Sequence, residues 1–192
     1  MVKRVLALGG QALFSALLAA CSPAMEWREY MLAGLPLAMS APCRPQSHAR
    51  RIDMAGRQVD MTLFACTLDG LTFALGAVDV NDPAVVGAML ATLASATVAN
   101  IHGRVDTDVA AEVPGMTPHH AARRQTVTGR SSRSEPMQVQ LAVFSVGTLA
   151  FQAALLGPII DTDAAQRFFS GLRVAHPVRG IGTSVPGASV PR

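Results

Sequence analysis

The chain lacks the sequence motifs that would point to a specific chemistry. It has three cysteines but no Cys-x-x-Cys pair, and no His-Glu-x-x-His sequence, so the common zinc spacings are absent. It also has no Gly-x-Ser-x-Gly nucleophile elbow and no Asp-x-Asx-x-Asx-Gly calcium loop. No single motif therefore identifies a catalytic or metal-binding activity.

The chain also lacks a strong charge of one sign. Sixteen Lys and Arg residues oppose thirteen Asp and Glu residues, giving a formal net charge of +3, and Lys3 is the only lysine. Lys3 and Arg4 lie within the first 20 residues, so without that segment 14 basic residues oppose 13 acidic ones and the net charge is +1. A nucleic-acid-binding surface carries a strong basic patch. This balance therefore argues against a nucleic-acid partner.

The amino-terminal segment has the layout of a secretory signal. Lys3 and Arg4 precede an apolar stretch over 5–18, and small residues follow it before Cys21. Such signals combine a charged start, roughly 7–15 apolar residues and a small-residue cleavage site. The stretch is too short and too interrupted for a spanning helix of about 20 apolar residues. An ordinary signal with a coincidental cysteine, or an apolar first helix of a soluble chain, stays open.

The sequence Leu18-Ala19-Ala20-Cys21 resembles the lipobox of bacterial lipoproteins. The resemblance implies a signal peptide over 1–20, thioether lipidation of Cys21, cleavage before that residue, acylation of the new amino terminus with a chain such as palmitate, and a lipidated tether over 21–26. Several acyl chains anchor a protein stably, so the membrane is an expected partner through Cys21. The expected location is the cell envelope, facing the periplasm. Ser22 replaces the aspartate that tends to retain lipoproteins at the inner membrane, which favours the outer membrane.

Cys43 and Cys66 remain as an even pair. Disulfides persist in oxidising compartments such as the periplasm, so we expect these two residues to form a disulfide. A bridge of this span would stabilise the fold by roughly 3 kcal/mol in the chain-entropy model. The alternative is two separate buried thiols, which pack as small hydrophobic groups.

The hydrophobic pattern predicts mostly strands. Alternating apolar residues indicate strands over 35–39, 51–54, 58–68, 71–80, 120–127, 137–146 and 149–156, with a strand or helical turn at 27–30. Residues 103–118 are polar and give no clear strand beyond a weak indication at Val105 and Val109. Asp69-Gly70 and Gly147-Thr148 are typical of tight turns.

Two helices are expected. Asp82 and Pro83 form a start signal for a core helix over 83–101. Asp82 and His102 limit this helix to a length shorter than a membrane-spanning helix needs. Asp161 caps a second helix, whose apolar side lies within 164–172. Strand groups followed by helices indicate one α+β domain over 27–176, with an antiparallel sheet packed against two main helices. We expect residues 177–192 to be a disordered tail.

Two stretches resemble small bacterial lipoproteins with the Mog1/PsbP-like fold. The first lies within 32–45 and reads Leu-Pro-Leu-Ala-Met-Ser-Ala-Pro-Cys-Arg-Pro, with Cys43 where that family has glycine. The second spans 143–172 and includes Phe-Ser-Val-Gly-Thr-Leu-Ala-Phe-Gln and Ala-Ala-Gln-Arg-Phe-Phe-Ser-Gly-Leu. The resemblance covers most of 27–175. It implies a sandwich of sheet and helices, an accessory binding role and no catalytic residues, although fold alone does not carry function across. We also expect no cofactor.

Arginines form the first candidate site. Arg123, Arg124, Arg130 and Arg133 surround an expected hairpin and form a possible partner-contact patch. Lipid head groups, lipopolysaccharide phosphates or an acidic partner would suit such a patch. The alternative is a charged sheet edge that blocks pairing with other chains.

Histidines and carboxylates form the other candidates. His119 and His120, with His102, are possible metal ligands, but neighbours in a strand point to opposite faces, so no metal site is expected. The candidate carboxylates for acid–base chemistry are Asp106, Asp108 and Glu112.

These observations favour a non-catalytic lipoprotein of the cell envelope that binds an unknown envelope protein or a small ligand. The alternative is a small envelope hydrolase or metal-dependent enzyme built on those histidines or carboxylates. A structural envelope protein without any ligand is the third hypothesis.

Overall fold

The computed structural model describes residues 25–54 and 56–175, so Cys21 and the 177–192 tail lie outside the described residues. The elements in chain order are β1 (Arg28–Met31), β2 (Leu37–Ala41), β3 (Gln46–Met54), β4 (Arg57–Leu68), β5 (Leu71–Asp79), a 3-10 turn (Pro83–Val85), α1 (Val86–Asn100), β6 (Arg104–Ala110), β7 (Arg123–Arg130), β8 (Pro136–Val146), β9 (Leu149–Gly157), α2 (Thr162–Ser170) and β10 (Arg173–Val174).

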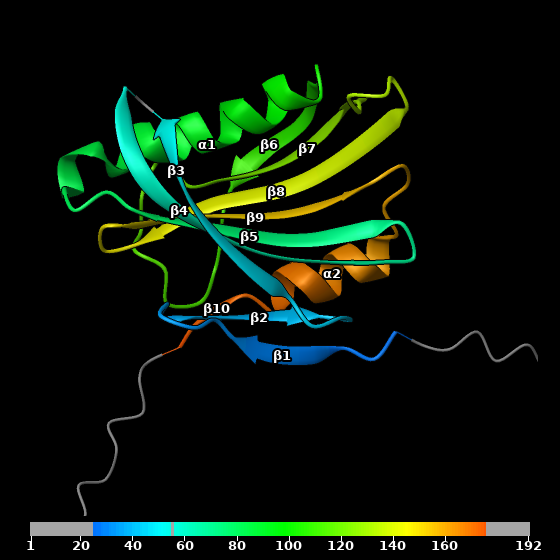
Figure 1. Ribbon diagram of the computed structural model, residues 1–192, viewed down its shortest axis with the longest axis horizontal. Helices are drawn as coiled ribbons and strands as arrows, with labels where there is room; N and C mark the ends of the chain where they lie inside the picture. The colour runs from blue at the N-terminus through cyan, green and yellow to red at the C-terminus, as the bar shows by residue number, and fades with distance from the viewer. Residues whose placement is uncertain (1–24, 55, 176–192) are drawn as a thin grey trace, which may run out of the picture.

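The strands form two antiparallel sheets. The large sheet has seven strands in the order β3-β4-β5-β9-β8-β7-β6, and the small sheet has three in the order β1-β2-β10. Helix α1 packs on one face of the large sheet, against β7, β8 and β9, whereas α2 contacts β9 and the small sheet's β2 (Figure 1). The predicted α+β class, with an antiparallel sheet and two helices, is confirmed.

The start and turn signals act as the sequence predicts. The Asp82 carboxylate accepts a hydrogen bond from the Ala84 amide, and Asp161 accepts one from the Asp163 amide, so both caps are confirmed. At the β4–β5 turn, Asp69 and Gly70 have φ of 50° and 78°. Two consecutive left-handed residues match the twist of the hairpin strands that they join.

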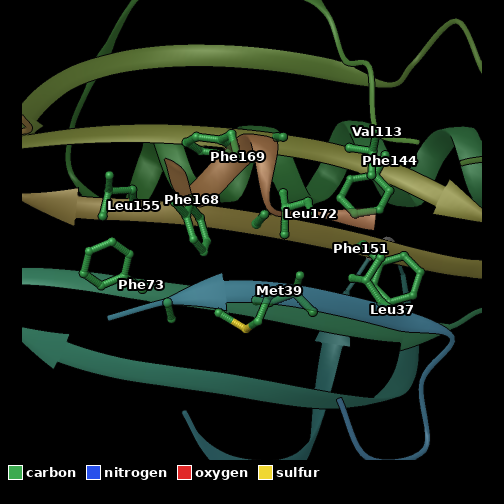
Figure 2. Packing of buried hydrophobic residues seen from close by; sticks show 14 of the residues in the cluster. Leu37, Met39, Phe73, Val113, Phe144, Phe151, Leu155, Phe168, Phe169 and Leu172 are labelled. Atoms are coloured by element: carbon green, nitrogen blue, oxygen red, sulfur yellow. The ribbon is translucent and has the colours of Figure 1, made fainter. Parts of the chain in front are cut away.

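Two hydrophobic clusters fill the domain, one on each face of the large sheet. On the α2 side, the buried rings of Phe73 and Phe168 meet edge to face at 5.6 Å between centroids, within a packed layer that Figure 2 shows. On the α1 side, Met89, Leu90 and Leu93 are at most 1% exposed. Each such side chain contributes roughly 1.5–3 kcal/mol through burial.

Helix α1 is more apolar than a surface helix needs to be. The segment Pro83–Asn100 is long and apolar enough, by length and composition, to cross a membrane, so the expectation that it falls below spanning length is wrong. The structure packs one side of it against the sheet, and 28% of that segment is buried.

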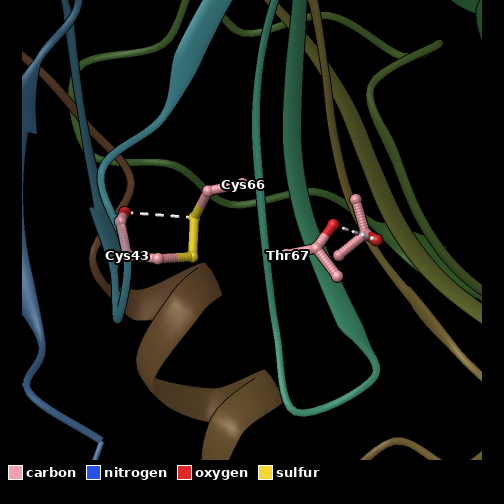
Figure 3. The surroundings of a disulfide bond; sticks show 4 residues. Cys43, Cys66 and Thr67 are labelled. Atoms are coloured by element: carbon pink, nitrogen blue, oxygen red, sulfur yellow. Dashed lines mark hydrogen bonds between the residues drawn. A yellow bond between two sulfur atoms is a disulfide. The ribbon is translucent and has the colours of Figure 1, made fainter.

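Cys43 and Cys66 form the predicted disulfide, with their Cα atoms 5.9 Å apart (Figure 3). Cys43 follows the small-sheet strand β2, and Cys66 lies in β4 of the large sheet. The bridge therefore joins the two sheets at the open end of the β3–β4 hairpin.

Several strand boundaries differ from the sequence prediction. Strand β3 begins at Gln46 instead of residue 51, because its first residues are exposed and pair with β4 without any buried alternation. Strand β7 covers Arg123–Arg130, three residues later than predicted. Strand β6 is well formed although all of its residues are exposed, and β10 pairs with β2 over two residues.

Candidate functional site

The four candidate arginines do not form one patch. Arg123 and Arg124 are neighbours on β7, so their side chains leave opposite faces of the sheet. Arg123 donates through Nε to the Asp108 carboxylate at 2.8 Å on the α1 side. Arg124 lies over the ring of Phe169, an α2 residue, 3.6 Å from its centroid. Arg130 and Arg133 lie at the β7–β8 turn, where Arg130 donates to the Ser134 carbonyl oxygen.

Arg124 forms the wall of a cleft between the large sheet and α2. The cleft has a volume of about 360 Å³ and is lined by Glu112, Arg124, Gln140, Thr162, Ala165, Gln166, Phe169 and Ser170. Arg124 Nη2 donates to Gln140 Oε1 at 3.1 Å. Gln140 lies two residues along β8 from the partner of Arg124, because it pairs with Thr126 while Arg124 pairs with Ala142, so both side chains leave the same face of the sheet. The guanidinium is thus held by a ring on one side and an amide on another.

The charge of Arg124 is not compensated by an ion pair. All thirteen Asp and Glu residues belong to the described part of the chain, and none has an oxygen within 4.0 Å of an Arg124 nitrogen there. Half-burial lowers the pKa of the Arg124 guanidinium below its ordinary value, yet an arginine remains charged at neutral pH. Guanidinium donors that protein groups leave free can bind a carboxylate or a phosphate.

The local sequence explains why the cleft forms here. Phe168 points into the core and is fully buried, and the adjacent Phe169 meets its ring at 5.0 Å between centroids while 6% exposed. Phe169 therefore completes the core and also supports Arg124. Neither Gln140 nor Gln166 belongs to a recognisable motif, so no sequence signal marks them as cleft residues.

The candidate carboxylates lie in separate places. Asp106 pairs with Arg104 at 2.6 Å, and Asp108 pairs with Arg123. Hydrogen bonds from Arg123, and more weakly from Gln125, hold the pKa of Asp108 below its usual value against the opposing effect of burial. Glu112 is exposed and faces the Arg124 cleft instead.

The histidines are also not brought to one point. His119 and His120 lie in the turn before β7, not in the strand, and their rings stack at 4.5 Å between centroids, so the expectation of opposite faces is wrong. His119 Nδ1 accepts from the Ala121 amide, and its ring packs against Gly87 at the start of α1. His102 follows the end of that helix, which at about 1.5 Å per residue is about 20 Å away. Within residues 25–54 and 56–175, no group of three or more His, Cys, Asp or Glu residues has a metal-binding arrangement.

Comparison of the chain with protein-family models, curated proteins and solved structures found no match in any of the three. The Arg124 cleft is therefore assigned from its own geometry.

Proposed function

We propose that this protein is a non-catalytic lipoprotein of the cell envelope that binds a carboxylate-bearing ligand or partner chain in the Arg124 cleft. Lipid on Cys21 anchors it, on the periplasmic side and at the outer membrane rather than the inner one. The support for this location is the lipobox resemblance of residues 18–21, together with a disulfide that suits an oxidising compartment. The α+β architecture is compatible with a Mog1/PsbP-like sandwich, which is the finer fold that we propose.

The observation that carries the binding proposal is the unpaired, half-buried guanidinium of Arg124. Its Nη2 donates to Gln140, its face rests on Phe169, and the cleft beside it is lined by the polar side chains of Thr162, Gln166 and Ser170. A desolvated cation without an ion-pair partner is costly to bury. A ligand carboxylate in the cleft would supply that partner.

The second charge in the cleft narrows the ligand class. Glu112 lines the same hollow, so a dianionic phosphate would be repelled more strongly than a carboxylate with one negative charge. A carboxylate also matches the planar fork of arginine, which donates two parallel hydrogen bonds. The geometry therefore favours a monoanionic carboxylate, such as the carboxyl end of a peptide.

The proposal can be tested by NMR of the arginine Nε–H groups in the ¹⁵N-labelled protein. The probes are triglycine, which has a free carboxylate, and triglycine amide, which does not. We expect triglycine to shift the Arg124 resonance saturably and the amide to leave it unchanged. Arg124→Lys keeps the charge but loses the fork and should weaken binding, and Arg124→Gln should abolish it.

The matched control is Arg133→Gln, which makes the same charge change at an exposed residue of the β7–β8 turn, outside the Arg124 cleft. Binding that is equal for both peptides, or equal in Arg124→Gln and Arg133→Gln, would mean that general positive charge rather than the cleft attracts the probe, and the proposal would fail.

A further inference from the structure

A second hollow lies on the opposite face of the large sheet, between α1 and the strands β6 and β7. It has a volume of about 500 Å³ and is lined mainly by apolar atoms from Ala91, Ala94, Val98 and Ala99 of α1 and from Val105 of β6. Its size lies within the range of roughly 300–1,000 Å³ that small-molecule sites occupy. We call this hollow the α1 groove.

The helix that forms one wall of the groove carries no charge. No residue of α1 is Asp, Glu, Lys or Arg, although Ala88, Ala91, Ser95 and Ala99 are exposed. The outer face of a helix on a soluble domain normally carries charged and polar residues. An uncharged face of small residues leaves room for an apolar molecule, but small residues alone do not make a site.

Gln125 supplies the second observation. This β7 residue lines the α1 groove, is 9% exposed, and its Oε1 has no hydrogen-bond partner within the described residues. The Gln125 side chain also helps to lower the pKa of the Asp108 carboxyl. Buried acceptors are nearly always paired in folded proteins, and an unpaired one is costly. The Oε1 atom is also buried from solvent, so a donor in the groove reaches it once the terminal amide of Gln125 turns toward α1.

The charges beside Gln125 cancel. Arg123 also lines the groove, and its Nε donates to Asp108 at 2.8 Å. The pair leaves no net charge for an anionic or cationic head group to meet. A ligand that complements this site is apolar along the helix, uncharged at its polar end, and provided with a hydrogen-bond donor.

We propose that the α1 groove binds a single alkyl chain whose uncharged head group donates a hydrogen bond, from a hydroxyl or an amide N–H, to Gln125 Oε1. The chain lies along the alanines of α1 and over Val105. This site does not depend on the Arg124 cleft, because Arg124 and Gln125 are neighbours on β7 and face opposite sides of the sheet.

The test compares three probes of similar chain length, namely 1-octanol, heptyl methyl ether and octanoate. Binding is followed through the methyl resonances of ¹³C-alanine-labelled protein. Octanol should shift the methyls of Ala91 and Ala94 saturably. The ether, which lacks a donor, should bind about three- to tenfold more weakly, the range expected for one hydrogen bond. Octanoate should bind more weakly than octanol because its charge has no partner.

Two variants assign the effect to the groove. Ala91→Phe fills the groove and should abolish octanol binding, whereas Ala88→Phe places the same ring at an exposed alanine that does not line it and should leave binding intact. Gln125→Leu should bind octanol and the ether equally, and a melting curve checks that the variant is folded.

Three results would overturn the proposal. The first is the absence of saturable octanol shifts up to its solubility limit. The second is tighter binding of octanoate than of octanol, or unchanged discrimination in Gln125→Leu. The third is self-association of the wild-type protein, measured by sedimentation equilibrium, that the Ala91→Phe variant loses. This result would mean that a second copy of the chain covers the groove.

Discussion

Removal of the disulfide should weaken the fold by a defined amount. The double substitution Cys43→Ser and Cys66→Ser opens a covalent loop with a sequence separation of 23 residues. Without the bridge, the unfolded chain gains the freedom that the loop had restricted, while the native hairpin keeps its β3–β4 pairing. The loss of stability therefore arises mainly because the unfolded state gains conformational entropy.

The loop length gives the magnitude. With about 23 residues in the loop, the chain-entropy relation gives an entropy of about 11.5 cal/mol/K, or about 3.4 kcal/mol at 25 °C. A domain of this size loses roughly 2–4 °C in Tm per kcal/mol, so the variant should melt about 7–14 °C lower. The structure adds a local consequence, because the bridge is the covalent link between the small sheet and β4.

Urea unfolding monitored by circular dichroism measures the change in unfolding free energy. Wild type in dithiothreitol should unfold at the midpoint of the double variant, and dithiothreitol should not move the variant. Cys21→Ala is present in both proteins, so that no third thiol can exchange. A wild-type midpoint that is the same with and without reductant would refute the bridge, and a loss well below 2 kcal/mol would refute the assumption of an unrestricted unfolded loop.

Three further predictions concern single side chains. Because Arg123 lowers the pKa of Asp108 in the native state, the ion pair stabilises the fold above the unfolded pKa of about 3.9 and this contribution is lost as pH falls through the lower native pKa. Asp108→Asn should thus lower the unfolding free energy by less than about 1 kcal/mol at pH 7, because solvent screens this ion pair. A difference between the urea midpoints of wild type and variant that is the same at pH 7 and pH 2 would contradict this prediction. Cys21→Ala should move the protein from the membrane to the soluble fraction, and membrane retention would argue against lipid anchoring. Gly129→Ala should destabilise by roughly 1–3 kcal/mol, since its methyl would meet the Ile101 carbonyl oxygen that accepts from the Arg130 amide, and an unchanged melting temperature would show that the contact relaxes.

The sequence predicts elements well where one face is buried. Strand β8 buries Val139, Leu141 and Val143 in regular alternation on its α1 side, and the Asp82 and Asp161 caps depend on neighbours two residues away. Strand β6 gives no such signal because every residue in it is exposed. Its strand state is imposed by pairing with β7, which lies beyond the reach of local patterns.

The candidate site is less predictable for the same reason. The cluster of arginines in the sequence contained Arg124, but nothing nearby indicated that its ring partner is Phe169, 45 residues later in the chain. Sequence proximity also grouped Arg123 with Arg124, although a strand sends them to opposite faces. The functional grouping is set by sheet register and by the position of α2, both of which follow from long-range pairing.

Strand β7 is the element through which the two proposed sites are linked. Arg124 is directed to the α2 face, where its charge has no ion-pair partner among the described residues, and Gln125 to the α1 face, where its Oε1 has no hydrogen-bond partner there. A shift of β7 by one residue would exchange the two faces. Its register is fixed by Val127, which is fully buried in the α1-side cluster, and by pairing with β8 from Arg123↔Val143 to Arg130↔Pro136. The packing that stabilises the sheet therefore also determines which ligand chemistry each face presents.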